Sequence, residues 1–510
     1  MRKTPTLLLL TALCLATLPT VTASNNALPA ASSLVVTNAT VIDGTGRQRF
    51  RANIRIEDDR IKTVGLFQPE PGERVIQADG MVVAPGFIDI HNHSEEGLSR
   101  EPAASNQVSQ GITTLAVGPD GSSPWPIKDY LEQREKQGTA VNVLCFVGHG
   151  TLREQVMGKD YDRPSTPEET AKMKTLVEQA MAEGAFGLSS GLEYDAGRAA
   201  TTGELIELAR AAAHNHGLYM THMRDEEEGM LAALREAILI GAKARLPVQI
   251  SHIKMGNRNV WRQAPRAIAL INRARRNGAD VTADCYPYTA WASTIAILVP
   301  SRRHEDRREV ETGLRNVGGA QNVLITNCRA HPDFEGKTLD QIASAVSSSP
   351  IEVYQRIVRD GGASVVCSSM NESDVHAFYR QPWVMVASDG GIGSRHPRGA
   401  GTFTRVLGQF VREKHLLTLE EAVRKMSSAP ARRLSLTDRG VIREGMKADL
   451  VIFDPSVVRD RSTFKEPGVL SIGIYRVLVN GQPVWENGSS TGRLPGVAIR
   501  NNSKDNQAGR

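Results

Sequence analysis

The chain is 510 residues long, with 40% hydrophobic and 23% charged residues, an ordinary composition for a soluble globular protein. This length exceeds what one compact core usually holds, so we expect a large domain accompanied by a smaller one. The net charge of +5 is spread too thinly to indicate nucleic acid or an anionic membrane surface as a partner.

The first residues have the pattern of a secretory signal peptide. Arg2 and Lys3 are followed by an apolar stretch over residues 7–18 and by small residues at 21–23. The stretch is shorter than the roughly 20 residues that a membrane-spanning helix needs. We therefore predict that residues 1–23 are removed and that the mature protein is exported, either periplasmic or secreted, without a stable membrane anchor.

Short alternating strands with Gly- and Asp-rich turns occur at both ends of the remaining chain, for example at residues 34–38 and 448–453. We expect residues 24–84 and 431–485 to build one small β-sandwich together. The last segment, residues 486–510, is polar and is expected to be loosely held.

Helical and strand patterns alternate over residues 85–430. Thr166-Pro167-Glu168-Glu169, for instance, is a capping box with proline at the first helical position. This alternation predicts an α/β fold, a (β/α)8 TIM-type barrel. Residues 300–350 fit neither periodicity, and we expect a lid or small subdomain inserted there between the last two strands.

Four cysteines remain after signal cleavage: Cys145, Cys285, Cys328 and Cys367. An oxidising compartment would allow them to pair. Cys145 and Cys285, however, lie inside apolar strand-like runs, which favours buried free thiols. The sequence leaves the disulfide state open.

A metal site is indicated by where the histidines fall. The strand-like run at residues 82–90 ends in His91-Asn92-His93, and residues two apart in a strand point to the same side. His222, His252 and Asp389 each end another short apolar run. Because the carboxyl ends of barrel strands converge on one face, these side chains are expected to meet and bind a metal ion.

These motifs as a set resemble the N-acyl-D-amino-acid deacylases, or D-aminoacylases, of the amidohydrolase superfamily. The resemblance runs from about residue 34 to residue 500. It is carried by residues 85–93, 148–153, 191–194, 221–226, 251–254, 286–288, 388–390 and 396–398.

The resemblance implies a zinc enzyme with one or two ions per chain that hydrolyses the amide bond of N-acyl-D-amino acids. His91, His93 and Asp389 are expected at one metal position, and His222 with His252 at the other.

Two carboxylates are candidates for the ligand that bridges the metals. Glu193 ends the fourth predicted strand, where the superfamily places its bridging carboxylate. Asp120 stands where well-known D-aminoacylases carry a metal-binding cysteine. The sequence slightly favours Glu193. By contrast, His149 and His396 are interpreted as structural rather than as ligands.

The resemblance also assigns catalytic and substrate-binding roles. Asp389 is expected to take the proton from the attacking water and to deliver it to the departing amine. Arg398, Lys254 and a phenol from Tyr286 or Tyr288 are expected to bind the free α-carboxylate of a small-molecule N-acyl amino acid.

Two other functions remain as alternatives. Hydantoinases, dihydroorotases and isoaspartyl dipeptidases share the histidines but generally bridge their metals with a carboxylated lysine, whereas the fourth strand here offers Glu193 and no lysine. A non-catalytic exported binding protein on the same barrel would leave Asp389 without a purpose.

Overall fold

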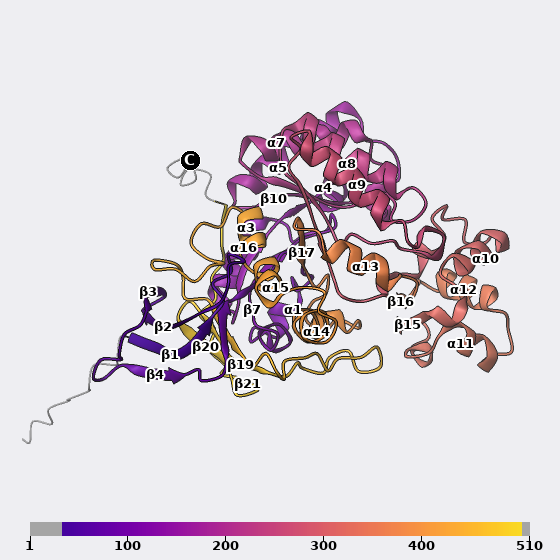
Figure 1. Ribbon diagram of the computed structural model, residues 1–510. Helices are drawn as coiled ribbons and strands as arrows, with labels where there is room; N and C mark the ends of the chain where they lie inside the picture. The colour runs from indigo at the N-terminus through magenta and orange to yellow at the C-terminus, as the bar shows by residue number, and fades with distance from the viewer. Residues whose placement is uncertain (1–32, 502–510) are drawn as a thin grey trace, which may run out of the picture.

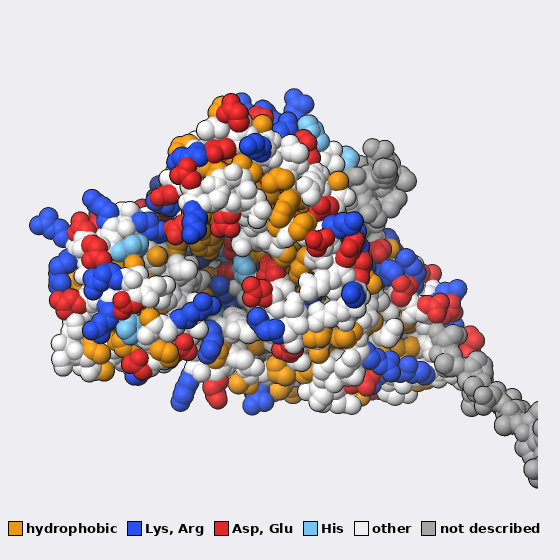
Figure 2. All heavy atoms as spheres, turned by 180° about the vertical axis from the view of Figure 1, so that it is seen from behind, with side chains coloured by type: hydrophobic (Ala, Val, Ile, Leu, Met, Phe, Trp, Pro, Cys, Tyr) orange, Lys and Arg blue, Asp and Glu red, His pale blue; other side chains and the backbone are white. Residues whose placement is uncertain are grey.

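The computed structural model describes residues 33–501 (Figure 1). The predicted signal peptide lies outside the described residues, so its prediction stays untested. Within residues 33–501, no helix is long and apolar enough to cross a membrane. Figure 2 shows basic and acidic side chains interspersed over one face of the molecule.

Strands from both ends of the chain form one sheet, seen in Figure 1 as indigo strands beside yellow ones. Strand β5 joins the two halves, because it pairs in parallel with β1 and antiparallel with β18. The sheet has nine strands in the order β21-β20-β19-β18-β5-β1-β2-β3, with β4 paired to β1. Their bounds are β1 Ser33–Val41, β2 Phe50–Glu57, β3 Arg60–Gly65, β4 Arg74–Gln77, β5 Val82–Pro85, β18 Leu450–Phe453, β19 Ile474–Val479, β20 Gln482–Glu486 and β21 Ser489–Ser490.

The barrel strands are parallel, short and almost entirely buried. Strands β8 and β9 are separated by Phe146 alone and act as one, which makes eight strands around the barrel. The first and last strands are joined where His93 N donates to Gly390 O (2.7 Å) and Asp389 N donates to His91 O (3.0 Å). The strands are β6 Phe87–Asp89, β7 Ile112–Val117, β8 Asn142–Cys145, β9 Val147–Gly148, β10 Gly187–Gly191, β11 Leu218–His222, β12 Val248–Ile250, β13 Val281–Cys285 and β17 Val384–Val386. The predicted fold class, a barrel with a β domain built from both chain ends, is confirmed.

Helices cover the outside of the barrel. The predicted capping box is present at α5, where Thr166 Oγ1 accepts from Glu169 N (3.2 Å) and the Glu169 carboxylate accepts from Thr166 N (2.8 Å). The helices are α1 Gly97–Arg100, α2 Ser105–Val108, α3 Ile127–Gln137, α4 His149–Met157, α5 Pro167–Ala182, α6 Asp195–Arg198, α7 Thr202–His214, α8 Met230–Ala244, α9 Ala264–Arg276, α13 Glu372–Tyr379, α14 Arg398–Arg405, α15 Leu419–Met426 and α16 Ser428–Arg433.

A small subdomain is inserted between β13 and β17 and projects to the right in Figure 1. It has a three-stranded antiparallel sheet in the order β14-β16-β15 and three helices. The elements are β14 Trp291–Thr294, β15 Val323–Asn327, β16 Ser364–Cys367, α10 Arg307–Asn316, α11 Leu339–Ala345 and α12 Pro350–Arg359. The insertion is therefore wider than residues 300–350, because both of its flanks are strands that pair with each other.

The end of the described chain packs against the barrel. Val143 N donates to Val497 O (2.9 Å), and Ile499 N donates to Val143 O (2.7 Å). The expectation that residues from 486 onward are loosely held is thus wrong as far as residue 501. Strand β8 pairs with β7 on one side only, and an unpaired strand edge offers free backbone groups to any nearby segment.

Cys145, Cys285, Cys328 and Cys367 are all buried and unpaired. Burial raises the pKa of the Cys145, Cys285 and Cys367 thiols, so these three are protonated at neutral pH. This outcome agrees with the interpretation of buried free thiols.

Candidate metal centre and active site

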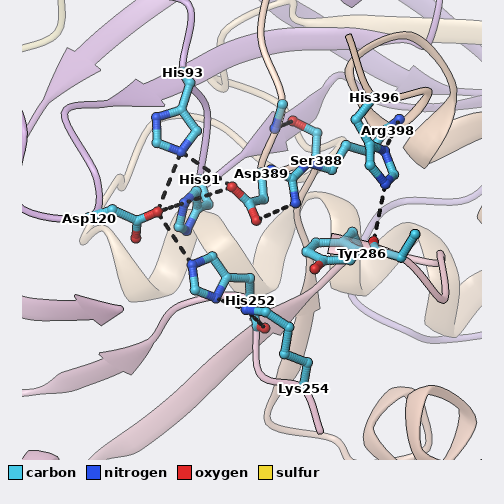
Figure 3. Close-up of polar contacts among 12 residues, drawn as sticks. His91, His93, Asp120, His252, Lys254, Tyr286, Ser388, Asp389, His396 and Arg398 are labelled. Atoms are coloured by element: carbon cyan, nitrogen blue, oxygen red, sulfur yellow. Dashed lines mark hydrogen bonds and ion pairs between the residues drawn. The ribbon is translucent and has the colours of Figure 1, made fainter. Parts of the chain in front are cut away.

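The site lies at the carboxyl ends of the barrel strands. His91 and His93 follow β6, whereas Asp120, His252 and Asp389 follow β7, β12 and β17. The last three have positive φ angles, of 55°, 32° and 48° respectively. A left-handed conformation costs a non-glycine residue about 1–3 kcal/mol and persists only where the surrounding structure holds it in place. Here it accompanies the convergence of the side chains that Figure 3 shows.

Asp120 is at the centre of this convergence. Its Oδ2 lies 3.2 Å from His91 Nε2, 3.5 Å from His93 Nε2 and 3.3 Å from His252 Nε2. Asp389 Oδ1 also lies near two of these imidazoles, 3.5 Å from His91 Nε2 and 3.3 Å from His93 Nε2. Five predicted ligands thus surround one point in the barrel mouth.

A second group of donors adjoins the first. His222 Nδ1 lies 2.9 Å from His252 Nε2, which is the atom that also faces Asp120. His252 is therefore shared between the group containing His91 and Asp120 and the group containing His222 and Glu226. Two neighbouring groups of donors suited to a metal, joined at His252, follow from this arrangement.

Glu193 lies on the far side of His222. Its Oε2 is 2.8 Å from His222 Nε2, the ring nitrogen that faces away from His252. A carboxylate on the outer nitrogen of a ligating imidazole orients the ring and raises its basicity. The structure thus places Asp120, rather than Glu193, among the imidazoles of His91, His93 and His252, whereas Glu193 contacts the outer nitrogen of His222. Which of the two carboxylates bridges the metals stays a prediction. A strand-end position shows only that a carboxylate is near the site, not which donor it reaches.

Glu226 is a site residue that the sequence analysis did not identify. It is buried, and its carboxylate pairs with Lys254 Nζ (2.5 Å) and with His252 Nδ1 (3.0 Å). Burial alone would raise the pKa of Glu226, but Lys254 and the two histidines outweigh it and lower the pKa to about 2. The sequence feature that could have identified Glu226 is its position four residues after His222, within the motif at residues 221–226.

Asp284 was also missed. It is fully buried in β13, accepts from His252 N (2.7 Å) and lies 3.6 Å from His91 Nδ1. Burial raises the pKa of Asp284 despite these partners. A carboxylate inside an otherwise apolar strand was the signal that marked it, and its contacts orient the backbone and ring of two ligands.

Asp389 links the metal-binding side chains to Arg398. Its Oδ2 accepts from Arg398 Nη1 (2.7 Å), and both side chains are buried. Burial would raise the pKa of Asp389, but Arg398, followed by His252, holds that pKa well below its usual range. His396 places Arg398, because its Nδ1 accepts from Arg398 N (3.0 Å) while its Nε2 faces Ala290 O (3.1 Å).

The two tyrosines predicted to bind the carboxylate have different surroundings. Tyr286 lines the cavity with Lys254 and Arg398, and its ring centroid is 4.8 Å from the Arg398 guanidinium carbon. Tyr288 does not line it. The Tyr288 hydroxyl donates to Pro397 O (3.4 Å), and its ring packs edge-on against His396. Both tyrosines follow the end of β13, where the regular alternation of side chains stops, so two-residue spacing does not keep them on one side.

His149 belongs to a separate buried network. Its Nε2 is 2.8 Å from the Glu204 carboxylate, which also accepts from Arg153 (2.7 Å). Its interpretation as a structural residue agrees with this position.

One more carboxylate, Glu227, lines the cavity. Burial, together with the nearby carboxylates Glu193, Glu228 and Asp225, raises the pKa of Glu227 to about 8. Among the described residues, no lysine, arginine or histidine forms an ion pair with it, and the metal groups do not include it.

The donor set fits zinc. Imidazole nitrogens and carboxylate oxygens are the ligands that zinc uses in catalytic sites. Two groups of such donors, which have His252 in common, are each close enough to hold one ion: His91, Asp120, His252 and Asp389, and His222, Glu226 and His252. Asp120 Oδ1 is buried without a hydrogen-bond partner among the described residues, as expected where a further ligand belongs.

Comparison with known proteins gives one consistent result. Residues 74–485 match the amidohydrolase family. The chain is 36% identical to D-aminoacylase of Alcaligenes xylosoxydans xylosoxydans, over 91% of this chain and 97% of that protein. A solved D-aminoacylase, described as having a binuclear centre with one-metal activation and second-metal attenuation, has a TM-score of 0.83 and 34% identity. The match covers 92% of this chain and 99% of the D-aminoacylase chain.

A second solved structure agrees. N-acyl-D-glutamate deacylase from Bordetella bronchiseptica, complexed with zinc and a phosphonate inhibitor, has a TM-score of 0.84 and 34% identity over 92% of this chain and 99% of its own. Similarity to proteins of the alternative functions is more distant: a D-hydantoinase structure is 15% identical with a TM-score of 0.56, which shows the fold alone. The chain therefore belongs to the amidohydrolase family, and within it to the N-acyl-D-amino-acid deacylases, or D-aminoacylases, that its motifs resemble.

Proposed function

We propose that this protein is a zinc-dependent enzyme that hydrolyses the amide bond of N-acyl-D-amino acids and releases a carboxylate and a free D-amino acid. The observation that carries the proposal is the contact of Asp389 with His91 and His93 on one side and with Arg398 on the other. A metal-binding group and a cation suited to a substrate carboxylate are thus joined in one cavity.

The residues that would hold zinc are His91, His93 and Asp389 at one position and His222 with His252 at the other, with Asp120 between them. Zinc bound there would acidify a water molecule and polarise the acyl carbonyl. The binuclear description of the D-aminoacylase structure and the zinc of the D-glutamate deacylase support one or two ions per chain.

Asp389 would move the proton. Because Arg398 keeps its carboxylate ionised, Asp389 can accept a proton from the attacking water. The same carboxyl group then donates that proton to the amide nitrogen as the carbon–nitrogen bond breaks. Arg398 remains beside it, so the site returns to its initial protonation state.

Three side chains would bind the α-carboxylate. Arg398 Nε is buried without a hydrogen-bond partner among the described residues, which leaves a donor for the substrate. Lys254 and Tyr286 line the same cavity. With the acyl carbonyl held at the metal and the carboxylate at these groups, two anchors orient Cα, and the side chain of only one enantiomer enters the remaining space.

A substrate comparison tests the proposal. Purified mature protein containing one to two zinc ions per chain by elemental analysis should hydrolyse N-acetyl-D-amino acids and not their L-enantiomers, and a chelator should abolish the activity. Hydrolysis of dihydroorotate or hydantoins instead would support the alternative, and active protein free of transition metal would contradict the mechanism.

Arg398→Lys tests the carboxylate-binding role. Lysine keeps the charge but loses the fork of parallel N–H donors, so kcat/KM should fall by roughly one to two orders of magnitude, corresponding to about 1.5–3 kcal/mol for a charged hydrogen bond. Discrimination between D and L substrates should weaken as well. An N-acyl amine that lacks a carboxylate is the control and should respond little. Unchanged rates and an unchanged enantiomer ratio would assign Arg398 to holding Asp389 only.

We also propose that the enzyme acts outside the cytoplasm. The pattern of residues 1–23 supports export. Fractionation of cells carrying the full chain, with and without these residues, tests it.

A further inference from the structure

The wall of the cavity next to the carboxylate-binding residues determines which substrate side chains fit. In an N-acyl amino acid the side chain and the α-carboxylate share one carbon atom, whereas the acyl group lies beyond the amide. The side chain must therefore occupy the space close to Arg398, Lys254 and Tyr286. Overall similarity does not decide its class, because relatives named for a D-glutamate substrate and for D-amino acids in general match this chain about equally.

Two hollows meet at the site and separate these groups. They share Tyr194, Ala292, Ser293, Asp389 and Arg398. The outer hollow extends past His93 and Asp120. The inner hollow contains Lys254 and Tyr286 and extends past them. Its wall away from these groups and from the metal-binding histidines includes Glu193, Glu227, Gly256, Trp291 and Ile297, and this part is left for the side chain.

The inner hollow has no lysine or arginine free for an acidic side chain. Among the described residues that line it, Lys254 and Arg398 are the only lysine and arginine, and both are already assigned to the α-carboxylate of the substrate. A substrate with a carboxylate in its side chain would bring a second negative charge against a wall that already carries carboxylates.

Glu227 is the carboxylate on this wall that has no basic partner among the described residues. A Cβ added at Gly256 would lie 3.6 Å from Glu227 Cγ, so the absence of a side chain at Gly256 leaves this flank of Glu227 uncovered. Glu193, by contrast, contacts His222. Trp291 donates its indole N–H to Gly256 O (2.9 Å), which holds its ring on the wall of the same hollow.

A groove next to the inner hollow shares Glu193 and Glu227 with it and contains three arginines. Each arginine has a carboxylate partner: Arg198 pairs with Asp162, Arg224 with Glu236, and Arg302 with Asp195. None of these arginines lines the inner hollow itself.

We propose that the inner hollow selects N-acyl-D-amino acids with a long cationic side chain, such as D-lysine, and that Glu227 determines this specificity. The proposal rests on the deacylase function proposed above and names its substrate class. The apolar surfaces of Trp291 and Ile297 would contact the methylene groups, and the ammonium group would pair with the Glu227 carboxylate.

The test compares N-acetyl-D-lysine with N-acetyl-D-norleucine, which has a side chain of four carbons and lacks the ammonium group. The zinc-loaded wild-type enzyme should have the larger kcat/KM for the lysine substrate and little activity on N-acetyl-D-glutamate. Glu227→Gln should lower the ratio of lysine to norleucine kcat/KM by roughly tenfold, the lower end of the effect of one hydrogen bond to a charged group. The change should appear in KM more than in kcat, because the contact exists in both the bound state and the transition state.

Glu228→Gln is the matched control, since Glu228 is the next residue, is exposed and does not line the hollow. It should leave the ratio unchanged. A wild-type ratio at or below one, or a ratio that Glu227→Gln leaves intact, would overturn the proposal while deacylase activity on norleucine stands. If neither D-substrate is hydrolysed by the zinc-loaded wild type, the proposed function itself is overturned, and this inference with it.

Discussion

Asp389→Asn is expected to lower kcat by roughly 10²–10⁴-fold, the usual contribution of a positioned general acid–base group. The substitution keeps the size of the side chain and one oxygen near His91 and His93, but it removes the group that accepts and returns a proton. Arg398 already keeps the wild-type Asp389 carboxylate ionised at neutral pH. Raising the pH should therefore not restore the activity of the Asp389→Asn variant. KM should change much less than kcat.

The measurement needs steady-state kinetics together with metal analysis. Asp389 Oδ1 also lies in the metal-binding group, so the zinc content of Asp389→Asn must be compared with that of the wild type. A loss of rate at full zinc content would assign Asp389 the proton transfer. A variant with full zinc and a kcat within tenfold of the wild type would assign that role to another group.

Asp120→Asn is expected to lose zinc and to lower kcat/KM by roughly 10²-fold or more, because removal of even an outer-shell partner of a ligand costs 10–100-fold. Asp120 Oδ2 faces three imidazoles, and the amide would present a neutral oxygen or an N–H donor to them. Asp120→Cys should retain zinc and much of the rate, since a thiolate is also a zinc ligand.

Glu193→Gln is the comparison for this prediction. Its carboxylate contacts only the outer nitrogen of His222, so the variant should keep near-stoichiometric zinc while its affinity for the metal weakens. Equal and full zinc in Asp120→Asn and Glu193→Gln would mean that neither bridges. Loss of zinc from Glu193→Gln alone would restore the preference that the sequence suggested.

The ligands that a sequence identifies well are those whose position follows from local periodicity. His91 and His93 are two residues apart after a buried strand, and His222 and Asp389 also come at or just after strand ends. Barrel geometry brings such positions to one face whatever the loops do. Tyr288 shows the limit of this reasoning, because it lies beyond the end of β13 and the spacing rule no longer applies to it.

By itself, the sequence determined the α/β barrel with its β domain, the family, and the histidines and aspartate of the metal-binding group, because strand patterns and strand ends are local features. Only the tertiary structure showed that Asp120 faces three imidazoles while Glu193 contacts His222 from outside, and only it brought Glu226 and Asp284 into the site. These are contacts between side chains from different strands and loops, and their distances depend on how each chain segment turns after its strand. The left-handed turns at Asp120, His252 and Asp389 are such a feature, since they are held by the packing around them rather than by the residues' own preferences.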